Sequence, residues 1–256
     1  MNDMDQKSLF SLYDIPAAFA LLTRIPMPFD YGKLSARGAH AVWAYPIVGA
    51  VVGAIAGLLI SLLAATPIPS AATAMLGLCV LVMLTGAMHE DGLADCADGF
   101  WGGATKERRL EIMRDSRIGA FGVIALIVVL VAEWSLIEGV VFADPVALFA
   151  AIGAASRAPI CAAMYALPNA RATGLSVLTG RPKLSTALLG LGLGGVIVLV
   201  IFGVSLLSFY LMLGAGFGAL IVYLLAYQKL GGQTGDVLGA SQKLAAVFAL
   251  AAAYLA

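Results

Sequence analysis

Four of the chain's 15 acidic residues stand within nine positions, in the segment MHEDGLADCADGF at residues 88–100. Among them, Asp91, Asp95 and Asp98 are spaced i, i+4 and i+7, which places three carboxylates on one face of a helix. Like charges so close together repel one another unless a cation lies between them, and carboxylate oxygens suit Mg²⁺ or Mn²⁺. The spacing therefore predicts a metal or catalytic site, and the alternative is a solvated helix end with scattered acids.

A second polar segment, KERRLEIMRDSRIGAFG at residues 106–122, alternates charges around apolar residues. That alternation predicts an amphipathic surface helix whose charged residues mostly face solvent, although Arg109 and Arg114 fit either a solvated or a functional role. Asp115 offers a further metal ligand. Arg117 offers a planar guanidinium that can hold two phosphate oxygens at once.

A third segment, GGQTGD at residues 231–236, is rich in glycine. Glycines let backbone N–H groups approach an anion, and the side chains of Thr234 and Asp236 can bind phosphate or metal. The segment lacks the Gly-Lys-Ser/Thr ending of a P-loop, so a turn that binds no ligand is the alternative.

Ionisable residues also fall inside apolar stretches. Arg157 lies near the middle of one stretch, where it must face a carboxylate, a water-filled cavity or a ligand phosphate. We expect a substrate contact there, with a structural ion pair as the alternative. Glu133 and Glu138 lie toward the end of another stretch and are expected to reach the membrane interface. His89, beside the acidic segment, fits either a supporting role at that site or plain packing.

The composition shows what kind of molecule must position these residues. The chain has 256 residues, of which 61% are hydrophobic and 12% charged, against roughly 25% charged in an ordinary soluble domain. Its mean hydropathy of +0.97 excludes a soluble enzyme and a disordered protein. The net charge of zero gives no basic excess for nucleic-acid binding. Three cysteines without paired spacing predict neither a disulfide framework nor a zinc site.

Seven apolar stretches can cross a bilayer, for which about 20 residues are needed. They cover residues 39–65, 70–88, 118–142, 145–167, 186–207, 209–228 and a short last stretch after a Gly-rich loop at 231–239. The segment 9–22 is shorter and contains Pro16, which predicts an interfacial or re-entrant segment. The expected fold is an all-α polytopic transmembrane helical bundle, a single integral membrane domain over residues 1–256.

Basic residues predict the orientation of this bundle. They concentrate before the first stretch and in the loops at 89–117, 169–184 and 229–240, whereas the opposite loops contain no Lys or Arg. The positive-inside rule therefore puts these three loops in the cytoplasm, where we expect the catalytic residues. The expected location is the bacterial cytoplasmic (inner) membrane, with a multi-pass chain and an active site that faces the cytoplasm.

Two further features concern the spans themselves. Gly49, Gly53 and Gly57 recur every four residues on one helix face, which predicts a close approach of another helix. The first residues, MNDMDQK, show no cleavable signal pattern, so we expect the spans to direct the chain to the membrane.

Together these segments resemble the cobalamin synthase family, also called adenosylcobinamide-GDP ribazoletransferase or cobalamin-5′-phosphate synthase. The similar segments run in order across nearly the whole chain. They are LTRIPMP (22–28), YPIVG (45–49), EDGLADCADG (90–99), RLEIMRDSRIG (109–119), SR (156–157) and GGQTGD (231–236). One departure is Glu90, which stands where many members have an apolar residue.

The resemblance implies an enzyme, a transferase that acts in cobalamin (vitamin B12) biosynthesis with Mg²⁺ as cofactor. The implied substrates are adenosylcobinamide-GDP and α-ribazole or its 5′-phosphate, and the products are adenosylcobalamin or its phosphate and GMP. The implied partners are these substrates and the lipid bilayer, without nucleic acid. We also expect a homo-oligomer or an association with other enzymes of nucleotide-loop assembly.

The resemblance and the residue patterns together predict the site. The expected catalytic residues are Asp91, Asp95, Asp115 and Arg117. The expected substrate-binding residues are Arg24, Arg157, Gly232, Thr234 and Gly235, and the expected metal ligands are Asp91, Asp95, Asp98 and Asp236.

Two other classes share part of this pattern. The CDP-alcohol phosphotransferases have D-x2-D-G-x2-A-R-x8-G-x3-D-x3-D, which residues 95–99 match at the start. Gly102 and Gly103 stand in place of Ala-Arg, and Ile112 stands in place of the next Gly. A transporter would hold its charges and broken helices near the middle of the membrane, whereas the acidic segment lies at the end of an expected span.

Overall fold

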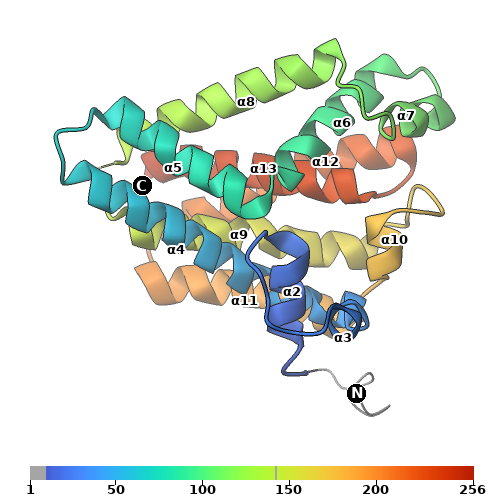
Figure 1. Ribbon diagram of the computed structural model, residues 1–256, viewed down its shortest axis with the longest axis horizontal. Helices are drawn as coiled ribbons and strands as arrows, with labels where there is room; N and C mark the ends of the chain where they lie inside the picture. The colour runs from blue at the N-terminus through green and yellow to red at the C-terminus, as the bar shows by residue number, and fades with distance from the viewer. Residues whose placement is uncertain (1–9, 142) are drawn as a thin grey trace.

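The computed structural model describes residues 10–141 and 143–256, and this part of the chain forms an all-helical bundle (Figure 1). Six of its helical segments are long and apolar enough to cross a membrane, which makes the chain a multi-pass membrane protein. They are η1 with α4 (Gly38–Ala44 and Tyr45–Ala64), α8 (Ala120–Gly139), α9 (Pro145–Ala166), α11 (Leu184–Phe202), α12 (Leu206–Leu230) and α13 with η2 (Gly235–Ala252 and Ala253–Leu255).

A bent helix pair, of which α5 is the apolar part, is the candidate for a seventh crossing. Helix α5 (Ser70–Thr85) ends where Gly86 and Ala87 adopt left-handed backbone angles, and α6 (Met88–Gly102) leaves at 87° to it. The expected span at 70–88 is therefore α5 alone, and half of the expected polar loop at 89–117 is helix α6. The sequence-based boundary was wrong here because the break depends on two left-handed residues rather than on hydropathy.

Other boundaries also shift. The expected break between the fifth and sixth spans lies instead at residues 203–205, where Gly203 has a φ of 65° and Ser205 caps α12 by accepting a hydrogen bond from the Ser208 N–H. The last span begins at Gly235, inside the expected Gly-rich loop. Phe142, the expected end of the third span, lies outside the described residues.

The predicted glycine packing is confirmed. A Cβ atom on Gly49, Gly53 or Gly57 would overlap a backbone carbonyl oxygen of α9, so α4 and α9 can approach this closely only through glycine. Gly214 and Gly218 of α12 meet the backbone of α13 in the same way.

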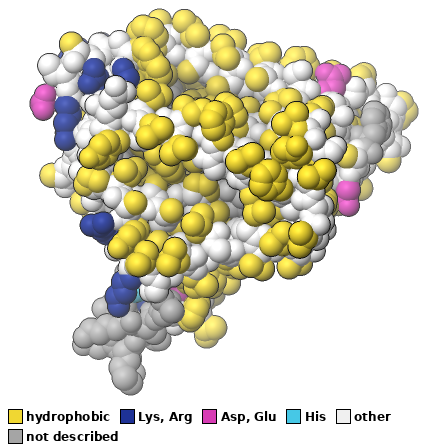
Figure 2. Space-filling model, turned by 180° about the vertical axis from the view of Figure 1, so that it is seen from behind, with side chains coloured by type: hydrophobic (Ala, Val, Ile, Leu, Met, Phe, Trp, Pro, Cys, Tyr) yellow, Lys and Arg dark blue, Asp and Glu magenta, His cyan; other side chains and the backbone are white. Residues whose placement is uncertain are grey.

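Short helices gather at one end of the bundle, which we call the polar end. They are α2 (Asp14–Leu22), α3 (Tyr31–Ser35), α7 (Lys106–Ile112) and α10 (Leu175–Thr179) (Figure 1). Helix α7 is the expected surface helix and has no buried residue. Figure 2 shows Lys and Arg grouped along one edge and an apolar surface across the rest of the face, as a bilayer-embedded bundle requires.

Helix α2 corresponds to the expected interfacial segment at 9–22. Residues 1–9, which include MNDMDQK, lie outside the described part of the chain. Helix α2 is too short to span a membrane. Its buried Asp14 accepts a hydrogen bond from Arg37 at 2.5 Å and another from the Trp43 indole at 3.0 Å. These bonds hold α2 against η1 at the polar end.

Candidate active site

The site begins with a cleft at the polar end between α6 and the segment after α7. Its volume is about 310 Å³, and we call it the aspartate cleft. It is lined by Asp91, Ala94, Asp95, Met113, Arg114, Asp115, Ser116 and Ile118. Two of the three predicted aspartates of α6 therefore face Asp115 across one opening, as a phosphate- or metal-binding site requires.

Helix α6 reaches this position by crossing the first turn of α13. A Cβ atom on Gly92 would lie 2.6 Å from the backbone oxygen of Asp236, so only glycine allows this contact. The contact brings Asp236 next to Asp91, although 145 positions separate the two in the chain. Thr234 fixes the turn, because its hydroxyl accepts from the Val237 N–H and donates to the Asp236 carboxylate, each at 3.2 Å.

The glycine-rich segment also brings in Arg171, which the sequence did not indicate as a site residue. A backbone bridge joins Asn169 to Gln233, and Gly232 lies so close to the Pro168 carbonyl that a Cβ there would overlap it. Arg171 then lies 3.2 Å from the Asp236 carboxylate. The structure thus gives Gly232 and Thr234 positioning roles, and substrate binding by Gly232, Thr234 or Gly235 stays a prediction.

Asp98 has a different environment from Asp91 and Asp95. It is buried, and its two carboxylate oxygens accept the backbone N–H groups of Gly119 at 2.7 Å and Gly122 at 2.9 Å. These are orphan donors at the start of α8, so Asp98 caps that helix. Its predicted role as a metal ligand stays untested, and the observed bonds use both of its oxygens.

The cleft is electrostatically unfavourable as it stands. Asp95 lies on α6 at the polar end, outside the membrane-spanning helices. Its partial burial and the negative charges of Asp236, Asp91 and Asp98 raise the pKa of Asp95 to about 7, and Arg171 only partly opposes this rise. Carboxylates crowded in this way favour a bound cation or a proton.

Asp115 on the opposite wall of the cleft is paired with Arg117, which lies just outside the lining. Arg117 donates to Asp115 at 2.7 Å, and the Arg117 side chain is 86% exposed. Hydrogen bonds from Arg117 lower the pKa of Asp115 to about 2, so Asp115 stays ionised and is a weak proton acceptor. An exposed guanidinium beside the cleft can turn toward an anionic ligand.

The carboxylates fit a magnesium ion that shares its ligands with substrate. Among the described residues, no three His, Cys, Asp or Glu side chains converge into a ready-made metal site. Mg²⁺ is usually held by one or two carboxylates plus substrate phosphates and water, so such a cage is not needed. Asp91 and Asp236, adjacent on two helices, are suitable oxygen donors.

Two predicted substrate-binding arginines lie outside the aspartate cleft. Arg24 is exposed and packs over Gly86 at the bend between α5 and α6. Arg157 is 3% exposed and donates within its own helix to the Gly153 carbonyl at 3.2 Å. Substrate contact by either stays a prediction, and among the described residues Arg157 forms no ion pair and its Nε has no hydrogen-bond partner.

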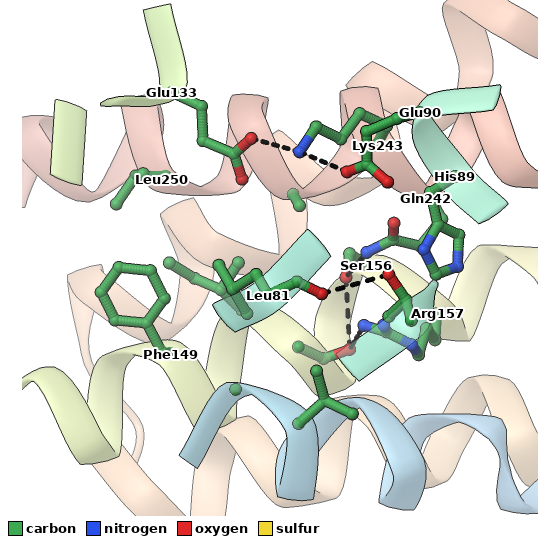
Figure 3. Close-up of a pocket in the computed structure, with 16 residues that line it drawn as sticks. Leu81, His89, Glu90, Glu133, Phe149, Ser156, Arg157, Gln242, Lys243 and Leu250 are labelled. Atoms are coloured by element: carbon green, nitrogen blue, oxygen red, sulfur yellow. Dashed lines mark hydrogen bonds and ion pairs between the residues drawn. The ribbon is translucent and has the colours of Figure 1, made fainter. Parts of the chain in front are cut away.

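Arg157 borders a second polar region, which we call the buried charge cluster. Its charged members are Glu90, Glu133, Arg157 and Lys243. Figure 3 shows the Lys243 amine between the two carboxylates: it lies 2.8 Å from Glu90 and also contacts Glu133. The associated cavity of about 40 Å³ has room for water but not for a substrate.

The sequence analysis missed this cluster. Glu133 is 4% exposed, so its expected place at the membrane interface was wrong: Lys243 compensates its charge inside the bundle. The sequence did contain a signal for the cluster: Glu133 and Lys243 are opposite charges in two different apolar stretches, and charges within a membrane usually pair.

Comparisons with known proteins agree with the arrangement. The family profile described as cobalamin-5-phosphate synthase matches residues 14–254. A relative from Mesorhizobium japonicum, named adenosylcobinamide-GDP ribazoletransferase, is 39% identical over 96% of this chain and 94% of its own length. Relatives with the same name from Brucella anthropi and Brucella ovis are each 37% identical, over 99% and 93% of this chain and 100% and 94% of their own lengths. No solved structure matches the chain significantly.

Proposed function

The chain belongs to the cobalamin-5-phosphate synthase family, and on that basis we propose that it is an adenosylcobinamide-GDP ribazoletransferase of cobalamin biosynthesis. The observation that carries the proposal is the match to relatives of that name over nearly the full length of both chains. The aspartate cleft supports it, since acidic and basic side chains around one opening are typical of phosphoryl transfer.

The reaction joins adenosylcobinamide-GDP to α-ribazole or its 5′-phosphate. A ribose hydroxyl that is free in both forms of ribazole attacks the phosphorus that bears the cobinamide arm, a new P–O bond forms, and the pyrophosphate bond breaks to release GMP. The hydroxyl proton passes to a carboxylate. Asp95 is the best acceptor in the cleft because its raised pKa lies near neutral pH, where general bases work most effectively.

Asp91 and Asp236 are the residues that would hold Mg²⁺. The ion would neutralise charge on the pyrophosphate and on the leaving GMP. Of the four predicted metal ligands, Asp91 and Asp236 keep that role in this proposal. Asp95 instead accepts the proton, and Asp98 caps α8. Arg114, Arg117 and Arg171 would hold the remaining phosphate charge with their planar donor groups.

We place the protein in the bacterial inner membrane with the cleft facing the cytoplasm. The distribution of basic residues supports this orientation. In a cysteine-free background, a membrane-impermeant maleimide applied to intact spheroplasts should label Thr66→Cys and spare Thr173→Cys. The opposite labelling would reverse the topology. Self-association or association with other nucleotide-loop enzymes stays a prediction, which the native mass in detergent tests.

The activity is tested with purified protein in liposomes. Adenosylcobinamide-GDP, α-ribazole and MgCl₂ are added, and mass spectrometry follows the products. The proposal predicts cobalamin and GMP in equal amounts, both lost when EDTA removes the metal. Folded protein that forms neither product contradicts the proposed function.

A further inference from the structure

An apolar groove lies beneath α10 and extends to Gly235, the residue before Asp236. It consists of two adjoining cavities: one of about 260 Å³ between α2, η1 and α10, and one of about 50 Å³ that extends to α6, α9 and α13. Both are lined by Leu21, Tyr45, Leu175 and Thr179, so they are neighbours. We call the pair the α10 groove. The larger cavity is near the lower size limit of small-ligand sites, roughly 300 Å³.

The groove ends next to the proposed reaction centre. Leu175 lines both cavities, and a Cβ atom on Gly235 would lie 3.7 Å from its side chain. Gly235 precedes Asp236, the carboxylate that α13 contributes to the site. A ligand in the groove therefore has one end within reach of the residues that surround the phosphates.

The inner end of the groove holds a polar group without a partner. His89 lies between the smaller cavity and the cavity of the buried charge cluster and lines both (Figure 3); it is 3% exposed and has no hydrogen-bond partner for Nε2 among the described residues. It lies on α6 only two positions before Asp91. A buried ring nitrogen left unpaired costs free energy, so this atom is a candidate for bonding to a ligand.

We infer that the α10 groove holds the aromatic base of ribazole while a free ribose hydroxyl reaches the aspartate cleft, an inference that rests on the proposed function. Ribazole has a flat, largely apolar benzimidazole ring at one end and hydroxyls at the other. The groove has apolar walls that match the ring and one buried nitrogen donor for its unsubstituted nitrogen. Carboxylates follow beyond the groove, where the hydroxyls of ribazole would lie. With its proton on Nε2, His89 donates to the unsubstituted ring nitrogen of the base.

The other substrate suits the groove poorly. The cobinamide ring with its amide arms is far larger than the cavities, and guanine would leave most of its hydrogen-bonding groups unpaired against these apolar walls. The base of ribazole is therefore the substrate part that the groove matches in size and polarity. A lipid acyl chain would fit the apolar walls but would leave His89 Nε2 without a partner.

The test places a charge in the groove. Leu175 is 46% exposed, so Leu175→Asp should fold, and the uncharged Leu175→Asn is the second variant. We expect Leu175→Asp to raise the KM for ribazole at least tenfold, with kcat and the KM for adenosylcobinamide-GDP within twofold of wild type. Ala36→Asp is the matched control, because it adds the same charge at the polar end and lines neither cavity. It should leave all three constants unchanged.

A binding measurement separates this inference from the proposed function. Calorimetry with α-ribazole alone should give at least tenfold weaker binding to Leu175→Asp and His89→Leu, with partial recovery in His89→Gln. Weaker binding together with no turnover by wild type would support the groove and reject the proposed activity. Normal turnover with unchanged ribazole KM and affinity in folded Leu175→Asp would overturn the groove assignment. Loss of co-purified phospholipid with unchanged ribazole binding would assign the groove to lipid and also overturn it.

Discussion

The aspartate cleft and the buried charge cluster begin one residue apart on α6, yet they differ in how their charges are compensated. Glu90 points into the bundle, where Lys243 neutralises it together with Glu133. Asp91 points outward into the cleft, beside further carboxylates that have Arg171 as a nearby cation. The first region pairs its carboxylates with a lysine of the same bundle, whereas the second leaves crowded carboxylates that favour a bound cation or a proton.

This difference indicates how to distinguish charged residues that stabilise the fold from charged residues that form a functional site in an apolar chain. Both regions contain acidic residues at or near membrane depth, so burial and residue type alone do not distinguish them. The two regions are distinguished by how completely a lysine or arginine of the same chain pairs with their acidic residues. Where Lys243 ties α13 to α6 and α8, the charges hold the helices that carry Asp91 and Asp236. Four substitutions test whether the two regions differ in this way.

The largest effect should come from removing the central cation of the buried charge cluster. Lys243→Met leaves two buried carboxylates unpaired, so the free energy of unfolding should fall by about 3–5 kcal/mol. Thermal unfolding of purified protein, followed by size-exclusion chromatography in detergent, measures it. Lys106→Met, at an exposed position of α7, should stay within about 0.5 kcal/mol of wild type. Recovery of stability in Lys243→Met combined with Glu90→Gln and Glu133→Gln would attribute the loss to the unpaired charges.

The next effect should be on turnover without a loss of stability. Asp91→Asn removes a proposed magnesium ligand from an exposed position, so kcat should fall about 10²–10³-fold, as when a group that stabilises transition-state charge is removed. Stopped assays that quantify GMP measure the rate. Thermal unfolding should occur at or slightly above the wild-type temperature, because removing one of several crowded carboxylates relieves repulsion.

The capping aspartate should behave as a structural residue instead. Asp98→Asn keeps the shape of the side chain but replaces one accepting oxygen with an amide nitrogen, so one N–H at the start of α8 loses its partner. We expect a stability loss of about 1–2 kcal/mol. Hydrogen exchange of the first turn of α8 should accelerate. Asp95→Asn, on the same helix, should leave that exchange unchanged, and equal acceleration in both variants would contradict the capping role.

The smallest effect should come from the exposed arginine of the cleft. Arg117→Lys keeps the charge but loses the planar pair of donors, so the KM for adenosylcobinamide-GDP should rise roughly fivefold, which corresponds to about 1 kcal/mol. The KM for ribazole should stay constant, since that substrate brings no pyrophosphate. Steady-state kinetics with each substrate varied in turn provide both values.

The sequence predicted what depends on local pattern and missed what depends on distant partners. Hydropathy was enough for the spans, and the spacing of Gly49, Gly53 and Gly57 was enough for the contact of α4 with α9. The α5–α6 break was missed because hydropathy continues across Gly86, whose conformation differs.

The candidate site was predicted in part for the same reason. Asp91 and Asp95 lie on the same helix, so their spacing in the sequence was enough to predict that they lie close together in the fold. Asp98 sits on that helix as well, but its partners Gly119 and Gly122 arrive only when α8 packs against α6. The sequence likewise did not predict that Arg171 contacts the site residue Asp236 or that Lys243 pairs with Glu90, because each partner lies in a distant segment.

Glu90→Gln and Asp91→Asn, at neighbouring positions of α6, distinguish a structural cluster from a catalytic cleft in one experiment. Turnover is measured in liposomes with saturating substrates and Mg²⁺, at matched amounts of folded protein. The account predicts that Glu90→Gln keeps at least a tenth of wild-type kcat while Asp91→Asn loses at least 100-fold. Near-normal turnover by Asp91→Asn, or an equal loss in a Glu90→Gln variant of normal stability, would contradict the division between a catalytic cleft and a structural cluster.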